Sequence, residues 1–450
     1  MHFQVLHHIN PIMRIRNYVL IAFAIVFCCG TTDAKSLADQ QIDSLIASHK
    51  FINIDGTAVD TRSREYIDSV NSIITTFYYD QFSHFSDPAA PYFLFLSRDS
   101  QLAMGIGGAV RMRAYYDWGG AIPFRAFSPY LIPIHPNPAN MRAFGTSPAG
   151  TCLFFRVLGR NKMLGQYQVY IEANFNGYQT RDFTLKKAYA IINDFTIGYA
   201  SSTFSDIAAV PPTIDANGPN NKLSMTSVLL RYMHTFRQRW TIAASLETPA
   251  TQIAADNENT CPVTNWLPDA AAFIQYQWDQ SQHVRLAGIV RSLSYRDMVA
   301  GANINRAGWA LQLSSVCHPA DPLTLYLTAN YGHGYGSLGG DLIMGAYDLV
   351  ADNGQPGRLI APPSMGWCAG VQYNFKHNFF VSASASQNIY LSKNEAPDEY
   401  RRGTFICANA FYNLTPRIQL GAEFALGQRQ NFSGEHRWAR RASAMCQFSF

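Results

Sequence analysis

Apolar and polar residues alternate one by one over most of the chain from about residue 101 onward. Residues 240–247 (WTIAASLE) and 323–331 (LTLYLTANY) show the pattern, with an apolar residue at every second position. Successive side chains of a β-strand point to opposite faces of a sheet, whereas a helix repeats about every 3.6 residues. The period of two therefore predicts an all-β fold, built from strands with one apolar and one polar face.

The alternating segments and their connections predict a closed antiparallel barrel. We count about sixteen strands, an even number as in bacterial single-chain barrels. They cover residues 102–118, 151–159, 163–175, 182–191, 195–203, 223–235, 238–248, 269–278, 282–297, 306–316, 322–332, 363–375, 378–391, 402–412, 416–428 and 437–450. Every second connection is tiny, as at 193–194, 237–238 and 376–377, while the longest others are 119–150, 204–222, 249–268 and 333–362. Short turns at one end and long loops at the other are typical of transmembrane barrels, with both termini at the short-turn, periplasmic end.

Three features favour a membrane barrel over a soluble sandwich of two sheets. Most segments reach about ten residues, which is enough to cross a bilayer at a tilt. Charged residues make up only 15% of the chain, against roughly 25% in soluble proteins. Tryptophans recur at strand ends, as an interfacial girdle of a membrane barrel requires, at Trp118, Trp240, Trp278, Trp309, Trp367 and Trp438. We therefore expect the apolar face of the sheet to meet lipid.

Both ends of the chain indicate export to a bacterial outer membrane. A basic start at Met13–Arg16, an apolar run at 18–27 and small residues before Lys35 predict a signal peptide over residues 1–34. The last predicted strand ends in Phe450, and a terminal aromatic residue after an alternating segment resembles the C-terminal signal of bacterial outer-membrane barrels. We therefore predict the outer membrane of a Gram-negative bacterium as the location.

Residues 35–100 differ from the barrel, which we place at 101–450. Apolar residues at helical spacing over 64–82 predict a helix, and residues 92–96 (YFLFL) predict a strand. We interpret residues 35–100 as a small periplasmic N-terminal segment. Its helix either packs within this segment or associates with other chains.

The region from about 100 to 250 resembles the DcaP-type trimeric porins of Gram-negative bacteria. The matching segments are 111–117 (RMRAYYD), 170–175 (YIEANF), 185–189 (LKKAY), 197–206 (IGYASSTFSD), 213–220 (TIDANGPN) and 231–232 (RY), in the order and spacing of the family. The resemblance implies a sixteen-stranded homotrimer that takes up small, often anionic solutes. It also implies a periplasmic coiled coil, but the helix predicted at 64–82 is short and lacks clean heptads.

The long connection 204–223 is the candidate constriction of the pore. It follows the fifth strand and carries Asp206 and Asp215 as its only charges before Lys222. The resemblance implies that this loop folds into the lumen, where its two carboxylates would face the passing solute. The alternative is an ordinary surface loop with solvated charges.

Arginines on the polar faces of the strands are the candidate residues of the facing wall. A charge that faces lipid at mid-bilayer costs about 2–4 kcal/mol, so these side chains are expected to point into the lumen. They are Arg111, Arg113, Arg156, Arg231, Arg285, Arg291, Arg437 and Arg441, and the inward acids are Glu172, Glu247 and Glu423. Because a guanidinium can bind both oxygens of a carboxylate, such a lumen would orient and pass anions. The alternative is that the arginines pair with the acids and stiffen the barrel.

Catalytic and metal-binding motifs are absent from the sequence, so we expect a protein that is not an enzyme and carries no cofactor or metal. No GxSxG, HExxH or P-loop pattern occurs, and the six cysteines after residue 34 match no metal-ligand spacing. The glycine-rich run 332–341 (GHGYGSLGGD) follows no strand-to-helix pattern, and we interpret it as a flexible loop.

The predicted function is an outer-membrane porin through which small polar, anionic solutes diffuse. Its partners would be outer-membrane lipid, small anionic solutes and two further copies of the chain. A net charge of +4 gives no reason to expect a nucleic acid. The alternative function is a barrel closed by its own loops, a structural or accessory component that serves a partner protein.

Overall fold

The computed structural model describes residues 50–53, 93–96 and 102–450, except 121, 123–124, 162, 176–181, 256–257, 280 and 393–395. The predicted signal peptide at 1–34 and the predicted helix at 64–82 lie outside the described residues. Within 35–100, the described parts are β1 (Lys50–Asn53) and β2 (Phe93–Leu96). The strand predicted at 92–96 is therefore confirmed, and β2 lies antiparallel to the start of the barrel.

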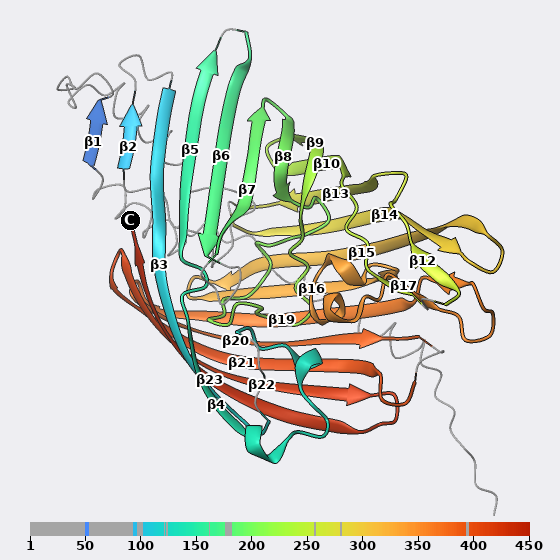
Figure 1. Cartoon of the computed structure of the whole chain (residues 1–450). Helices are drawn as coiled ribbons and strands as arrows, with labels where there is room; N and C mark the ends of the chain where they lie inside the picture. Colours follow the sequence, from blue (N-terminus) through green and yellow to red (C-terminus); the bar gives the residue numbers. More distant parts are fainter. Residues whose placement is uncertain are drawn as a thin grey trace, which may run out of the picture.

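Sixteen antiparallel strands of the described chain form a closed barrel (Figure 1). They are β3 (Leu102–Trp118), β5 (Cys152–Asn161), β6 (Gly165–Phe175), β7 (Phe183–Ile192), β8 (Phe195–Ser201), β9 (Thr226–Phe236), β10 (Trp240–Glu247), β13 (Asp269–Gln277), β14 (His283–Asp297), β15 (Ala302–Ala320), β16 (Leu323–His333), β19 (Pro363–Lys376), β20 (Phe379–Tyr390), β21 (Tyr400–Thr415), β22 (Ile418–Asn431) and β23 (His436–Ser449). Each strand pairs with the next, and β23 pairs with β3 to close the ring. All sixteen overlap the sixteen predicted segments, and the largest difference is at β15, which is longer than predicted.

The long connections contain further short elements. β4 (Arg142–Ser147) and β12 (Thr260–Pro262) extend the barrel sheet, while β11 (Ile253–Ala254), β17 (Leu349–Ala351) and β18 (Leu359–Ile360) form a separate three-stranded sheet. Short 3-10 turns occur at η1 (Pro129–Leu131), η2 (Pro138–Asn140), η4 (Gly336–Leu338) and η5 (Asp341–Gly345). The glycine-rich run 332–341, which we interpreted as a flexible loop, contains turn η4 and the first residue of turn η5. Both turns have buried residues. Among the described residues, no helix is long and apolar enough to cross a membrane.

The outer surface of the barrel is an apolar band between two sets of aromatic rings. Along β10, exposed and buried residues alternate without exception, and the exposed set begins with Trp240. Trp240 contacts Tyr276 at 4.8 Å between ring centroids, and Trp309 contacts Tyr331 at 5.8 Å nearer the other end of the strands. Such girdles mark the two interfaces of a bilayer, so the exposed aliphatic side chains between them face lipid.

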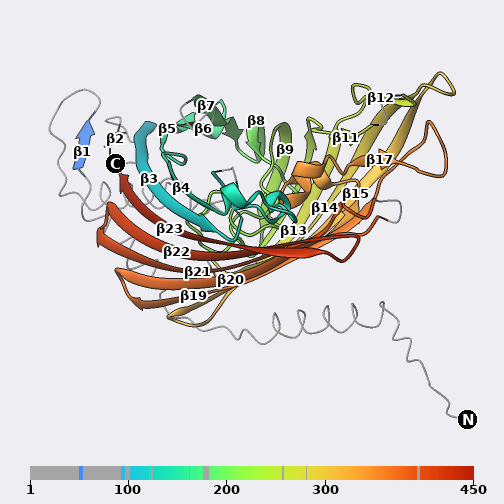
Figure 2. The ribbon, with the colours of Figure 1, turned by 60° about the horizontal axis from the view of Figure 1, so that its bottom comes forward.

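The interior of the barrel is occupied by loops that fold inward from the long-loop end. Figure 2 shows the teal turn η1 and the orange turns η4 and η5 within the ring of strands. Buried side chains of these loops, including Phe204, Leu338 and Tyr347, pack with inward residues of the wall such as Phe273 and Tyr390. The apolar core of this protein is therefore partly a loop core inside the barrel.

The lipid-facing band predicts the effect of a charge placed in it. Leu286 is half exposed and lies on β14 between the two girdles. We expect Leu286→Arg to lower the free energy of unfolding in lipid vesicles by about 2–4 kcal/mol, because a mid-bilayer guanidinium must be desolvated. Urea titration followed by the heat-resistant gel band measures it. Leu286→Ala is the control, and an equal loss in both variants would contradict the assignment of this face to lipid.

Candidate functional site

The loop between β8 and β9, residues 202–225, lies inside the barrel, and we call it the lumen loop. Most of its side chains are buried, including both of its carboxylates. The carbonyl of Pro212 accepts hydrogen bonds from Ser382 Oγ at 3.1 Å and Asn409 Nδ2 at 2.9 Å, on β20 and β21 of the far wall. The loop therefore folds into the lumen, as the resemblance to DcaP-type porins implied, and crosses to the opposite wall.

The first anchor of the lumen loop is Asp206. Its Oδ2 atom lies 2.9 Å from His283 Nε2 and accepts a hydrogen bond from Ser314 Oγ, while Oδ1 lies 3.7 Å from Arg285 Nη1. Burial opposes the charged form of this carboxyl, but the Arg285 guanidinium and His283 outweigh it and hold the pKa of Asp206 well below its usual range. Arg285 also stacks on the Phe273 ring at 4.3 Å, so the cation is fixed between wall and loop.

The second anchor is Asp215, near the tip of the lumen loop. Its carboxylate accepts the backbone N–H of Phe127 at 3.0 and 2.9 Å and a hydrogen bond from Arg441 Nη1 at 3.2 Å. Arg441 also binds both oxygens of Asp117, at 2.6 and 2.8 Å. One arginine thus connects strands β3 and β23 with the tip of the loop, which explains its near-complete burial.

The peptide groups of the same tip are held by Glu423 and Arg113. Glu423 accepts the N–H groups of Ile214 and Asp215 at 2.7 and 3.0 Å, from the wall strand β22. Arg113 donates to the carbonyl of Ile214 at 2.9 Å, from β3. The hydrogen bond from the Arg113 guanidinium is charge-assisted and therefore stronger than a neutral one, and together with Glu423 it holds the tip from two directions.

The third anchor holds the connection from 334 to 362. Arg291 on β14 lies 3.0 Å from Asp269 and 2.9 Å from Asp348, and its Nη1 atom also donates to Gly334 O and Ser337 Oγ. Asp348 and Ser337 belong to the connection, while Asp269 belongs to the neighbouring strand β13. Arg291 therefore repeats the arrangement of Arg441, with one cation between wall and loop.

These anchors settle where six of the ten candidate constriction residues lie. Asp206, Asp215, Arg113, Arg285, Arg291 and Arg441 make loop-to-wall contacts, and Arg285, Arg291 and Arg441 are less than 2% exposed. A charge that is paired and desolvated contributes little field to a solute elsewhere in the lumen. These six residues therefore take part in contacts that join a loop to the wall.

The remaining basic candidates lie elsewhere on the wall. Arg111 donates to Gln447, Arg156 donates to Gln168 at 2.9 Å, and Arg231 donates to the carbonyl of Ser201 at 3.3 Å. These three arginines come from β3, β5 and β9. Arg437 lies near the start of β23 and is half-buried, and it donates a hydrogen bond to the carbonyl of Gly119 at 3.0 Å.

Lys186 on β7 is an inward cation that the sequence analysis missed. Its Nζ atom lies 2.8 Å from Glu172 Oε1, and its side chain is 30% exposed. The β6–β7 pairing shifts register between Glu172 and Ala173, so alternation does not decide whether Lys186 or Lys187 faces inward. Lys186 completes a basic stretch of wall formed by Arg111, Arg156, Lys186 and Arg231, with Glu172 as its acid, and we call this set the basic wall.

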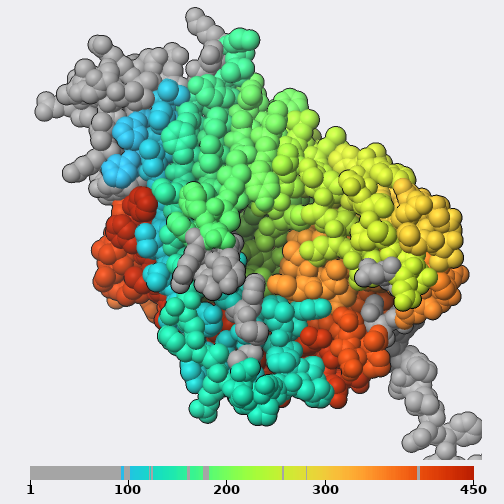
Figure 3. Space-filling view, viewed as in Figure 1, coloured from blue at the N-terminus to red at the C-terminus, as the bar shows by residue number. Residues whose placement is uncertain are grey.

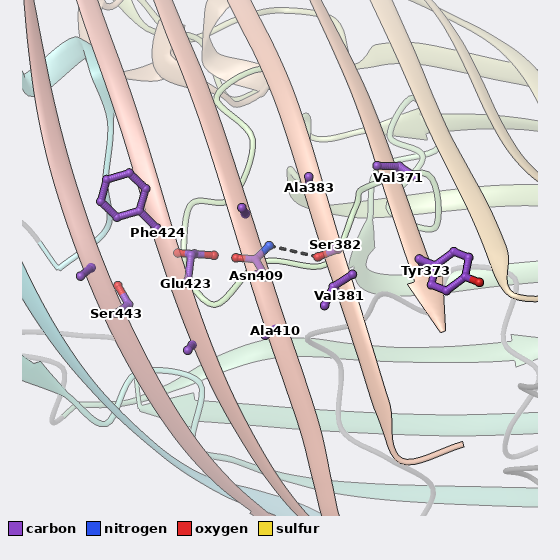
Figure 4. A pocket seen from close by; sticks show the side chains of 13 residues that line it. Val371, Tyr373, Val381, Ser382, Ala383, Asn409, Ala410, Glu423, Phe424 and Ser443 are labelled. Atoms are coloured by element: carbon purple, nitrogen blue, oxygen red, sulfur yellow. Dashed lines mark hydrogen bonds between the residues drawn. The ribbon is translucent and has the colours of Figure 1, made fainter. Parts of the chain in front are cut away.

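Figures 3 and 4 each show a hollow formed by described residues. The space-filling view shows one on the face of Figure 3, between the green segments near residue 200 and the orange segments near residue 340. The other measures about 630 Å³ and crosses β19–β23 (Figure 4). Its apolar lining residues, among them Ala383, Ala410 and Phe424, belong to the outward-facing set of their strands, so this second hollow lies on the lipid-facing wall.

Within the described part of the chain, no group of three His, Cys, Asp or Glu side chains is placed to bind a metal ion. All six described cysteines keep their thiols unbridged.

Known structures share this architecture although their sequences differ. No protein-family model matches the sequence, and no curated protein matches it. The outer membrane channel DcaP of Acinetobacter baumannii is 17% identical, with 79% of this chain and 99% of that chain covered at a TM-score of 0.67. A loop-deletion mutant of OmpT, an outer membrane protein of Vibrio cholerae, is 9% identical over 78% and 100% of the chains, with a TM-score of 0.51. An anion-selective porin from Comamonas acidovorans is 10% identical over the same shares, with a TM-score of 0.50.

These similarities confirm, at the level of the fold, the resemblance to DcaP-type channels. The chain has the fold of outer-membrane channels, and its closed sixteen-stranded barrel with a lipid-facing band is an outer-membrane barrel.

The Asp206 anchor predicts how the lumen loop responds to loss of its cation. We expect Arg285→Met to weaken the attachment of the loop by about 3–5 kcal/mol, because Asp206 is left as a buried charge without its guanidinium. Hydrogen exchange of residues 202–210 should then accelerate. Adding Asp206→Asn to the same chain should restore part of the protection, and unchanged exchange in Arg285→Met would contradict an anchoring role.

Proposed function

We propose that this barrel is a diffusion porin for small polar solutes and that it favours anions. The observation that carries the proposal is the number of inward cations on one stretch of the wall. The acids of the lumen loop, Asp206 and Asp215, are bound by wall arginines. Among the described residues, the basic wall consists of the cations Arg111, Arg156, Lys186 and Arg231 and the acid Glu172, which lies 2.8 Å from Lys186.

The basic wall provides the chemistry that an anion passage requires. A pore needs a narrow section and an electrostatic field within it, and rings of Arg and Lys favour anions. Cations on low-dielectric walls also raise the local concentration of oppositely charged solutes. Lys186 is the most accessible of the four cations, because Arg111, Arg156 and Arg231 are buried. The hollow of Figure 3 lies beside strands of this wall and is the proposed mouth of the passage.

A barrel closed by its loops is the second candidate function. Its supporting observation is the apolar core inside the lumen, where Phe204, Leu338 and Leu342 pack with wall residues. Such a barrel would serve a partner protein without conducting. Recordings from purified protein in planar bilayers separate the two functions, because steady ion channels support the porin and their absence overturns it.

Neutralising either member of the Lys186–Glu172 pair tests the proposed preference for anions. We expect Lys186→Gln to shift the reversal potential in a salt gradient towards cations and Glu172→Gln to shift it towards anions. A unit charge at about 4 Å contributes roughly 1 kcal/mol in water, so the permeability ratio should change about two- to fivefold in each direction. Lys376→Gln, near the short turn between β19 and β20, is the control. Cation preference of the wild type would overturn the anion proposal.

The proposed assembly is a homotrimer, and the outer hollow of Figure 4 is the surface that supports it. Ala410 lies opposite Ala422, and Ala383 lies opposite Ala408, so small side chains meet across β20, β21 and β22. The neighbouring Phe424 and Tyr373 rise beside them. A floor of small residues lets a neighbouring wall approach closely, which is how membrane segments gain packing contacts.

A bulky residue in this hollow tests the trimer. We expect Ala422→Phe to convert the oligomer to monomers in mild detergent, because overpacking an interface costs about 1–3 kcal/mol. Mass measurement by light scattering reports the change, and the heat-resistant barrel should persist. Leu311→Phe, on the exposed face of β15, is the matched control and should leave the oligomer intact. Equal assembly of both variants would place the interface elsewhere.

A further inference from the structure

Three inward loops meet at one buried carboxylate, Asp341, that none of the loop anchors uses. Asp341 begins turn η5 in the connection 334–362. Its Oδ1 atom accepts a hydrogen bond from Ser128 Oγ at 2.7 Å, and Ser128 precedes η1 in the connection 119–150. Its Oδ2 atom accepts a hydrogen bond from Asn220 Nδ2 at 2.9 Å, in the lumen loop. One side chain therefore joins all three loops.

The same carboxylate also reaches the wall of the barrel. Tyr400 on β21 donates its hydroxyl to Asp341 Oδ2 at 3.2 Å. Asn220 in turn accepts a hydrogen bond from Ser386 Oγ at 2.8 Å, on β20. The backbone N–H of Asp341 donates to Asn220 O at 2.8 Å, which adds a direct contact between two loops.

Glycine at two positions permits this close approach. Gly339 has φ of 139° and Gly340 has φ of 67°, a region that side-chain-bearing residues rarely adopt. A Cβ atom on Gly340 would lie 2.5 Å from Asn220 O, and one on Gly339 would lie 2.6 Å from Lys222 O. The glycine-rich run therefore brings Asp341 against the lumen loop.

All hydrogen-bond partners of Asp341 are uncharged, in contrast to those of Asp206, Asp215 and Asp348. The titratable groups that surround it are Tyr400 on β21, Tyr130 in η1, Tyr347 after η5, Arg429 on β22 and Glu399 before β21. Arg429 is turned to Tyr130, with its guanidinium over the ring at 5.3 Å and a hydrogen bond to Tyr130 O at 2.8 Å. Glu399 is bound by the Tyr347 hydroxyl. Among the described residues, no cation pairs with Asp341 itself.

We propose that Asp341 forms a protonation-dependent contact, which we call the latch. When its carboxyl is neutral, the latch holds the three loops together across the lumen and narrows the passage. This inference rests on the proposed porin function. Ser128 and Tyr400 carry hydroxyl groups, which can donate to the carboxylate or rotate to accept from the protonated carboxyl. The contact thus persists in both states, while its strength changes.

The direction of the pH effect follows from the site. Burial raises the pKa of Asp341 to about 6, and its uncharged hydrogen-bond donors offset only part of that rise. When the loops separate, water reaches the carboxyl and its pKa returns to about 3.9. The joined loops therefore bind a proton that the separated loops do not, and acid stabilises the joined arrangement. Between pH 7.5 and pH 5 the equilibrium should move towards the joined loops by about tenfold.

Single-channel recording of the full-length protein at these two pH values tests the latch. We expect the wild type to spend more time in a low-conductance state at pH 5. Asp341→Asn imitates the neutral carboxyl, so it should stay in that state at both pH values. Asp341→Ala removes the contact and should stay in the high-conductance state at both. Asp352→Asn, in the same connection but paired with Arg358 and away from the latch, should respond like the wild type.

The outcomes separate the latch from the porin function. A pH response that survives in Asp341→Asn would overturn the latch and leave the porin intact, as would steady wild-type channels without any pH response.

If no channels form, the porin proposal fails, and hydrogen exchange decides whether the latch exists. After correction for the intrinsic pH dependence of exchange, the loop amides of the wild type should exchange about tenfold more slowly at pH 5 than at pH 7.5, whereas those of Asp341→Asn should not. The amides concerned are those of residues 126–132, 218–223 and 336–345. Equal protection in both proteins would overturn it.

Discussion

The structure depends on one constraint, which is that lipid offers no hydrogen-bond partner to a peptide group. Every backbone N–H and C=O within the bilayer must be satisfied by another strand, so an open sheet edge cannot remain there. The pairing of β23 with β3 removes both edges at once. Closure then gives each strand an outer face that meets lipid and an inner face that does not. The two-residue alternation of the sequence follows directly from this.

Closure also decides where charge can lie. Arg285, Arg291 and Arg441 cannot face lipid, and in the lumen they meet loops that carry acids. A buried cation is stable only with excellent partners, so each arginine fixes the loop that supplies them. The long connections are therefore folded into the barrel by the same electrostatics that keep the arginines out of the bilayer, and an apolar loop core can form between them.

The wall of this barrel could be predicted from the sequence, whereas the contents of its lumen could not. Strand positions and facing follow from a local period, and every predicted strand has its counterpart. Which arginine pairs with which acid depends on contacts such as Arg441 with Asp117, more than three hundred residues apart in sequence, and no periodicity records them. The bulge in the β6–β7 pairing hid Lys186. Asp341 lies in a glycine-rich run whose composition suggested flexibility, although two glycines there allow a close contact.

The role of a carboxylate in the lumen thus depends on whether it lies beside a cation, and the number of charged residues in the chain does not determine it. Asp206, Asp215 and Asp348 each lie close to a guanidinium and act as fixed anchors between loop and wall. Asp341 has the same side chain and comparable burial, but its hydrogen bonds come from uncharged groups, namely two hydroxyls, a side-chain amide and the backbone N–H of Tyr130. Burial raises the pKa of Asp341 to about 6, because neutral donors stabilise a carboxylate less than a cation does and offset only part of that rise. The lumen of this protein can therefore be held by ion pairs at several acids and still respond to protons at Asp341.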